Sequence, residues 1–169
     1  ATMPTPFDAR AQTWDEDPRR VQLAADIFAA LDRRVPLRHD MSALDYGAGT
    51  GLLALALAPR VRRVLAVDAS PGMLDVLRQK AAAAGLANVE TLRADFSREP
   101  PPPGPFDLVT SAMTLHHVAD VELLFRKFFG LLAPGGQHAL ADLDAEDGSF
   151  HQNPAGEHHS GFDRATLAR

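Results

Sequence analysis

The chain has 169 residues, of which 46% are apolar and none is cysteine, and its formal net charge is −5. A chain of this length folds as one domain and buries roughly two thirds of its unfolded surface. The lack of cysteine excludes disulfides and thiolate zinc sites. An acidic chain without a long basic stripe is a poor partner for nucleic acid, so we expect no nucleic-acid partner.

The apolar runs of the sequence are too short to cross a membrane. None approaches the roughly 18 residues that a spanning helix needs, and the first residues lack the apolar segment of a signal peptide. We therefore expect no membrane partner and a cytoplasmic location.

The first regular element expected along the chain is an amphipathic helix. Residues 1–16 are predicted to be irregular, and Asp17-Pro18 then opens a helix that stops before Pro36, because aspartate caps helices and proline suits their first turn. Its apolar stripe comprises Val21, Ala24, Ala25, Phe28 and Leu31. Trp14 precedes this helix and either covers a ligand or packs as an anchor at the end of a sheet.

A glycine-rich turn, Gly47-Ala48-Gly49-Thr50-Gly51, follows an apolar strand that ends at Asp45-Tyr46, and a helix over 52–58 follows the turn. Glycines allow positive φ and leave no Cβ between the main chain and a ligand. A dinucleotide-binding turn reads G-x-G-x-x-G, whereas here the third glycine comes one residue early. Asp45 would repel a pyrophosphate but can pair with a cationic ligand, so the motif disfavours NAD.

A second strand, 64–67, ends in another carboxylate, Asp68. This aspartate lies about 20 residues after the first glycine, where a ribose-binding carboxylate is expected in α/β units. Taken alone, it also fits a solvated residue at a strand end. Ser70-Pro71 then predicts the start of a helix over 71–84.

Three more strands are expected in the rest of the chain. The first, 89–93, is followed by Asp95-Phe96, and a proline-rich stretch over 99–105 predicts an extended connector into the next strand, 106–110. A helix over 120–132 ends at Pro134-Gly135-Gly136, and the last strand covers 137–143. Alternating strands and helices with short turns predict a parallel sheet covered on both faces.

The segment Asp45 to Gly51 resembles the first motif of the class I S-adenosylmethionine (SAM) dependent methyltransferases. Leu115-His116-His117-Val118 is similar to the segment after the fourth strand in bacterial-like, small-molecule members. The resemblance implies an α/β fold: a Rossmann-like, doubly wound, mostly parallel sheet in the order 3-2-1-4-5 with helices on both faces. It also implies SAM as cofactor and S-adenosylhomocysteine (SAH) as product.

The resemblance also assigns roles at the carboxyl edge of the sheet. The glycine turn and Asp45 would hold the amino-acid part of SAM, Asp68 its ribose, Met73 an adenine face and Asp95 the adenine amino group. The implied cofactor-binding set is Asp45, Tyr46, Gly47, Ala48, Gly49, Asp68, Ala69, Met73, Asp95, Phe96 and Thr110.

The fourth strand of this family ends beside the methyl group that is transferred. His116 or His117 is a candidate general base, because imidazole is partly neutral near physiological pH, and the other histidine is expected to pack or to bond to the backbone. Many methyl acceptors need positioning alone. The substrate side is expected to include Trp14, Met113 and His151.

The last strand ends in Asp142-Leu143-Asp144, and the polar segment beyond it contains Asp147, His151, His158 and His159. Their spacing matches no tight metal motif, so we expect a solvated or substrate-facing loop and no metal. A helix opening at Asp163 stops with the chain, where the family continues into an antiparallel strand pair. That pair is expected to be missing, either by truncation or because a second copy covers the edge in a homo-oligomer.

These features predict one domain over 1–169. It has an N-terminal lid and helix at 1–36, a cofactor-binding core at 42–143 and a truncated substrate-side segment at 144–169. The predicted activity is transfer of a methyl group to an O, N or C nucleophile of a small molecule by in-line displacement. The alternative is a domain that binds SAM or SAH without turnover.

Overall fold

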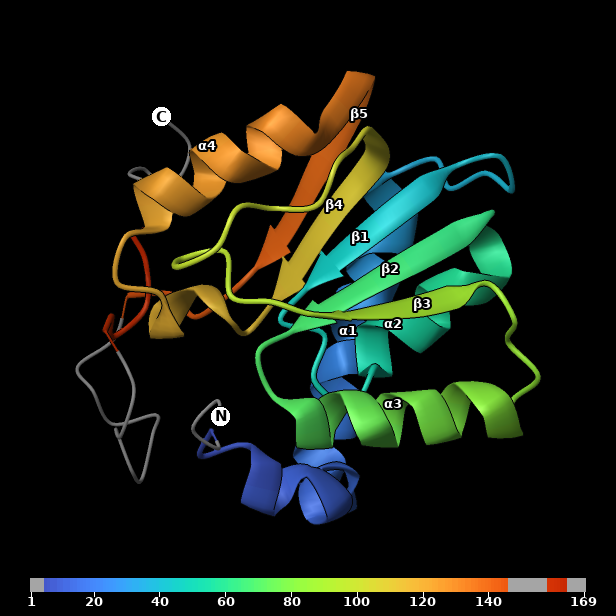
Figure 1. Cartoon of the computed structure of the whole chain (residues 1–169), viewed down its shortest axis with the longest axis vertical. Helices are drawn as coiled ribbons and strands as arrows, with labels where there is room; N and C mark the ends of the chain where they lie inside the picture. The colour runs from blue at the N-terminus through green and yellow to red at the C-terminus, as the bar shows by residue number, and fades with distance from the viewer. Residues whose placement is uncertain (1–4, 146–157, 164–169) are drawn as a thin grey trace.

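A five-stranded sheet forms the centre of the computed structural model, which describes residues 5–145 and 158–163. The strands are β1 (Ser42–Tyr46), β2 (Arg63–Asp68), β3 (Val89–Arg93), β4 (Phe106–Ala112) and β5 (Leu132–Ala141). Their order is β3-β2-β1-β4-β5, and all four neighbouring pairs are parallel (Figure 1). The predicted fold class and strand order are confirmed, and the described residues contain no antiparallel strand pair.

The described helices are the 3₁₀ helices η1 (Asp8–Glu16), η2 (Ala58–Arg60) and η3 (Leu115–His117) and the α-helices α1 (Pro18–Arg34), α2 (Leu52–Leu57), α3 (Pro71–Ala83) and α4 (Val121–Leu131). Three of the described α-helices, α1, α3 and α4, begin at a side-chain cap. The Asp17 side chain accepts from Arg19 N, and the Ser70 side chain accepts from Met73 N. The predicted caps of α1 and α3 are therefore confirmed.

The two faces of the sheet carry separate apolar clusters. Helices α1, α2 and α3 cover one face, and α4 lies on the other (Figure 1). Neighbouring residues on β1 divide between the clusters, since Ala43 packs under α1 and α2 whereas Leu44 packs with α4, and both are 0% exposed. A strand buried on both faces is typical of a parallel sheet.

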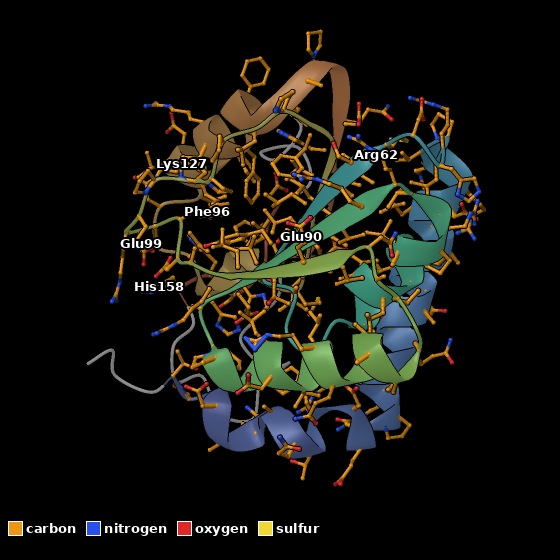
Figure 2. The ribbon with its side chains drawn as sticks, turned by 45° about the vertical axis from the view of Figure 1, so that its right-hand side comes forward. Arg62, Glu90, Phe96, Glu99, Lys127 and His158 are labelled. Carbon is orange, nitrogen blue, oxygen red and sulfur yellow. The ribbon has the colours of Figure 1, made fainter. Side chains whose placement is uncertain are left out.

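The crossing from β3 to β4 contains no helix or strand, as its prolines predict. Lys127 of α4 fastens this connector, because its Nζ donates to the carbonyl oxygens of Phe96 and Glu99 (Figure 2). The face of the sheet opposite α1, α2 and α3 is therefore covered by α4 and by this connector, which Lys127 holds in place.

The structure corrects the predicted bounds of three elements. Residues Asp8–Glu16 form η1, although 1–16 was predicted to be irregular. Strand β4 continues to Ala112, two residues beyond the predicted end. Strand β5 begins at Leu132 and ends at Ala141, not over 137–143.

The early start of β5 has a local cause. Leu132 pairs with Phe106 and Gln137 pairs with Leu108, so the ladder shifts register between these two pairs. The shift accommodates Pro134-Gly135-Gly136 as an irregularity inside the strand instead of a turn before it. Proline is tolerated there because β5 is an edge strand of the described sheet.

Within the described part of the chain, no helix is both long and apolar enough to cross a membrane.

Candidate functional site

The glycine loop lies between β1 and α2 at the carboxyl edge of the sheet. Gly47 N and Ala48 N both donate to Val67 O, at 2.8 and 3.0 Å, which holds the loop against β2. Gly47 and Gly49 have φ of 72° and 54°. A Cβ on Gly47 would lie 2.1 Å from Thr114 Oγ1, whereas a Cβ on Gly49 would meet no atom within 4 Å. Gly47 thus packs against the turn after β4, and Gly49 leaves open surface for a ligand.

Asp68 joins the glycine loop to the start of α3. Its Oδ2 accepts from Gly49 N and its Oδ1 from Ser70 N, each at 2.8 Å. Burial raises the pKa of Asp68, although these main-chain bonds oppose the rise. Each carboxylate oxygen can accept more than one hydrogen bond, so the same side chain can also receive a ribose hydroxyl.

Asp45 is a buried carboxyl group at the end of β1. It is 2% exposed, and its Oδ1 accepts from the Thr110 hydroxyl at 2.7 Å. Burial raises the pKa of Asp45 to about 7, the Thr110 bond opposes the rise, and the nearby charge of Asp68 adds to it. A cationic group beside Asp45 would favour its ionised form.

Tyr46, Phe96 and Asp95 connect the ends of β1 and β3. The Tyr46 and Phe96 rings lie 4.8 Å apart, and Phe96 N donates to the Tyr46 hydroxyl at 3.2 Å. Burial raises the pKa of Tyr46, and the Asp95 charge adds to the rise. Asp95 accepts from Ser97 N and Oγ. Since both rings are buried, at 5% and 0% exposure, they support the edge from inside.

Two other predicted cofactor residues are also largely enclosed. Met73 in the first turn of α3 is 2% exposed and Ala48 is 9% exposed, while Ala69 is half-buried. The Met73 side chain packs in the interior, so its contact with adenine stays a prediction that needs this side chain to turn outward.

The predicted substrate-side residues are placed differently. Met113, after β4, has φ of 54°, the one positive value at a non-glycine position among the described residues, and its N donates to Ala141 O. The Arg20 guanidinium lies 4.0 Å from the centroid of the Trp14 ring, and Phe7 packs on the ring edge-to-face at 5.9 Å. Trp14 therefore packs within the N-terminal segment. His151 lies outside the described residues.

The two histidines of η3 have different surroundings. His116 is 2% exposed, and its Nδ1 lies 2.7 Å from Asp142 Oδ1. His117 is half-buried, and its ring lies edge-to-face with Phe7 at 5.4 Å. His116 is thus the histidine that packs and pairs, and His117 is the one that lies against the N-terminal segment.

Two aspartates of the N-terminal segment bond to residues next to the predicted site, and sequence reasoning missed both. Asp8 Oδ1 accepts from Ser70 Oγ at 2.6 Å and from Gly72 N at 2.8 Å. Asp15 accepts from Thr50 Oγ1 at 2.6 Å and from Lys80 Nζ at 2.5 Å. Their partners lie 35 to 65 residues away in the chain, so no local pattern could have revealed them.

Replacing Lys80 with methionine is expected to loosen the N-terminal segment. The change removes the ion pair to Asp15 and the hydrogen bond to Thr50 O. Because both side chains are about 30% exposed, the loss of stability is expected to be small, about 1 kcal/mol. Hydrogen exchange over residues 8–16 is the measurement, and exchange there is expected to rise more than elsewhere.

Arg78→Met is the matched control, since Arg78 lies on the same helix and pairs with Asp75. If the two variants raise hydrogen exchange in η1 equally, the ion pair of Lys80 does not specifically stabilise this segment.

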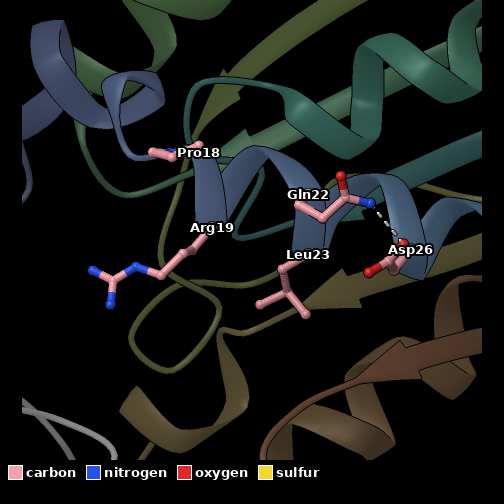
Figure 3. A pocket seen from close by; sticks show the side chains of 5 residues that line it. All are labelled: Pro18, Arg19, Gln22, Leu23 and Asp26. Carbon is pink, nitrogen blue, oxygen red and sulfur yellow. Dashed lines mark hydrogen bonds between the residues drawn. The ribbon is translucent and has the colours of Figure 1, made fainter.

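A shallow depression of about 460 Å³ lies on α1 and is lined by Pro18, Arg19, Gln22, Leu23 and Asp26 (Figure 3). The Gln22 amide donates to Asp26 Oδ1 at 2.9 Å, so these polar groups satisfy each other. No predicted site residue lines this depression. The described residues also hold no cluster of three acids or histidines suited to a metal ion.

Comparison with known proteins identifies the family. Residues 43–136, from β1 into β5, match the methyltransferase domain family. An uncharacterized methyltransferase of Geobacillus kaustophilus is 32% identical over 146 residues, which cover 83% of this chain and 63% of that protein. The demethylmenaquinone methyltransferase of Thermus thermophilus is 43% identical over 102 residues, covering 59% of this chain and 46% of that protein.

The solved structure of a DhpI–SAH complex is 29% identical, with a TM-score of 0.68, and the match covers 82% of this chain and 66% of that chain. The chain spans 63%, 55% and 48% of the lengths of three curated relatives, roughly half of each. On sequence and fold together, the chain belongs to the class I SAM-dependent methyltransferase family.

Proposed function

We propose that the chain binds SAM at the carboxyl edge of β1, β2 and β3 and transfers its methyl group to a small molecule. The observation that carries this proposal is the acidic cradle around the glycine loop. Asp68 bonds to Gly49 N, and its charge acts on the buried Asp45. SAM carries a sulfonium and an ammonium group, and an acidic edge favours such a cation.

Each part of the cofactor has a proposed contact. The open surface at Gly49 and the carboxyl group of Asp45 would receive the amino-acid part, and Asp68 the ribose. Asp95 would receive the adenine amino group. Phe96 N donates to the Tyr46 hydroxyl, so a bond from it to the adenine would replace that one. The SAH complex of the DhpI relative supports this ligand for the family.

In methyl transfer from SAM, the main task of the protein is to align the acceptor with the methyl group. SAM supplies the methyl group and its own leaving group, so the chain aligns the acceptor in line, excludes water and takes up a proton where the acceptor releases one. His117 is the better-placed candidate base, since it is less buried than His116. Thr110 and Ser111, at the end of β4, offer further main-chain contacts.

The acceptor is proposed to be a small molecule with an O, N or C nucleophile. The name of the Thermus thermophilus relative, a demethylmenaquinone methyltransferase, supports a small-molecule acceptor. The alternative is a domain that binds SAM or SAH without turnover.

Calorimetric titration with SAH, with NADH as the parallel control, tests the cofactor. We expect micromolar binding of SAH and no binding of NADH, because the glycine spacing and Asp45 disfavour a pyrophosphate. NADH binding alone, or binding of neither ligand, would contradict the proposal. Acceptor screening with SAM then separates an enzyme from a binding domain.

Replacing Asp68 with alanine is expected to weaken SAH binding by about 1 to 3 kcal/mol, which is the scale of charge-assisted hydrogen bonds. The variant loses the proposed ribose contact and also the anchor of the glycine loop. Calorimetry measures the affinity. Asp75→Ala, at an exposed position on α3, is the control, and an Asp68 variant that binds as well as this control would refute the ribose assignment.

A further inference from the structure

We propose that Asp142 is a positioning residue. It fixes the orientation of His116 and, through His116, places His117 at the acceptor side of the site. This inference rests on the proposed methyl transfer. Asp142 directly follows β5. It takes no part in the hydrogen bonds that join Asp68 to Gly49 and Ser70.

The pairing of Asp142 with His116 is buried and directional. Both side chains are 2% exposed, and His116 Nδ1 lies 2.7 Å from Asp142 Oδ1. Asp142 Oδ2 also accepts from Leu115 N at 2.7 Å, and Oδ1 accepts from Leu143 N at 2.9 Å. Burial alone would raise the pKa of Asp142, but these bonds hold it below its usual value.

An ionised carboxylate only accepts hydrogen bonds, so Nδ1 of His116 carries the proton in this pair. The pair therefore fixes both the orientation of the imidazole and which ring nitrogen donates to Asp142. Carboxylates orient histidines in the same way in many active sites.

His117 depends on this anchor because the two histidines are consecutive in a single short turn. Their ring centroids lie 4.0 Å apart. Asp142 bonds to η3 at both Leu115 N and the His116 ring, while Phe7 packs edge-to-face against the ring of His117. The position of His116 against Asp142 thus determines where the His117 ring contacts the N-terminal segment.

The far side of η3 is held by other parts of the chain. His116 O accepts from His158 N at 2.8 Å and from His159 N at 3.1 Å, and Met113 N donates to Ala141 O. These are main-chain bonds, whereas Asp142 contacts the ring of His116. Removing the carboxylate should therefore move the histidine rings before it unfolds the turn.

Asp142→Asn tests the proposal, and Asp120→Asn is its matched control. Asp120 caps α4 through a bond to Leu123 N and lies outside the proposed site, so the control also loses a charge at a side chain that accepts a main-chain bond, and asparagine can keep the cap. With ¹⁵N-labelled histidine, NMR reports which ring nitrogen of each histidine is protonated and how close Phe7 lies to His117. Calorimetry reports SAH affinity, and turnover reports kcat and KM.

In Asp142→Asn we expect the ring resonances of both His116 and His117 to shift and the Phe7–His117 contact to weaken. SAH affinity is expected to change by less than about twofold, because Asp68 and the glycine loop keep their own bonds. With a methyl acceptor, kcat is expected to fall about 10- to 100-fold, the cost of a misplaced catalytic group, with little change in the KM for SAM. The control is expected to change none of these values.

Unchanged His117 resonances in Asp142→Asn would overturn the proposal, as would an SAH affinity that falls together with folding stability. A second test is the double variant His116→Gln/Asp142→Asn. If Asp142 acts through His116, the double variant displaces His117 no further and turns over no more slowly than His116→Gln alone, whereas additive losses contradict this route.

Two safeguards keep the test decisive. If Asp142→Asn does not fold, Asp142→Glu keeps the charge but lengthens the side chain, and it should shift the His117 resonances; unshifted resonances contradict the proposal. The NMR comparison needs no cofactor. Failure of every variant to bind SAH would therefore count against the proposed function, while the resonances would still decide the role of Asp142.

Discussion

Replacing Asp45 with asparagine is expected to stabilise the ligand-free protein at pH 8 and to weaken its binding of SAH. Asp45 is buried at the end of β1, and burial raises its pKa from 3.8 to about 7. At pH 8 the native state holds an ionised carboxylate out of water, which is costly. Asparagine does not ionise, and its carbonyl oxygen can still accept from the Thr110 hydroxyl.

The direction of the pH dependence follows from the protons bound in each state. The native state keeps the Asp45 proton up to about pH 7, whereas the unfolded state releases it near 3.8. The stability that Asp45 contributes is therefore complete below pH 3.8 and is lost as the pH rises through about 7. Over this window the loss is at most about 4 kcal/mol.

Urea unfolding between pH 4 and pH 8 measures this effect. The wild-type protein should lose stability across the window relative to Asp45→Asn, while Asp26→Asn, at a surface site on α1, should follow the wild type. Calorimetry should show weaker SAH binding by Asp45→Asn, by about 1 to 3 kcal/mol, because the ammonium group loses its counter-charge. Parallel stability curves for the wild type and Asp45→Asn would show that Asp45 ionises normally.

Gly47→Ala is expected to be among the most destabilising single substitutions at the carboxyl edge. A Cβ there would lie 2.1 to 2.7 Å from three side-chain atoms of Thr114, so the turn after β4 must move. Overpacking of this kind costs about 1 to 3 kcal/mol. The φ of 72° adds strain, since left-handed backbone costs a residue with a Cβ about 1 to 2 kcal/mol.

Gly85→Ala separates the two costs, because Gly85 has φ of 66° but no atom within 4 Å of the Cβ position. It should show the backbone strain without the collision. Adding Thr114→Gly to Gly47→Ala should recover much of the difference between the two variants, as measured by urea unfolding and SAH affinity. If Gly47→Ala lowers the free energy of unfolding no more than Gly85→Ala does, the packing of the loop against Thr114 does not contribute to stability.

The proposed cofactor residues at the ends of β1 and β2 could be picked out from the sequence because their signals are local. Strand ends carry Asp45 and Asp68, and a glycine turn follows the first strand, so a short window contains both the element and its proposed ligand-binding group. Parallel strands then bring the separate ends to one edge without further information.

The contacts that join distant parts of the chain could not be anticipated in the same way. Asp142 and His116 lie 26 residues apart, and Asp8 and Ser70 lie 62 apart, so only the tertiary fold joins them. Burial is equally invisible in a local pattern. Met73 fits an adenine contact by position in the chain, yet its side chain is buried at 2% exposure.

The position of β1 in the sheet has a kinetic consequence. The bond from Gly49 N to Asp68 closes a loop of 19 residues, whereas the bond from Thr110 to Asp45 closes one of 65. The longer closure costs about 1 kcal/mol more chain entropy, so β1 and β2 are expected to associate before β4 joins them. A ligand that touches both Asp68 and Asp45 would then bridge the two strands that associate first, and would stabilise that pair before β4 joins it.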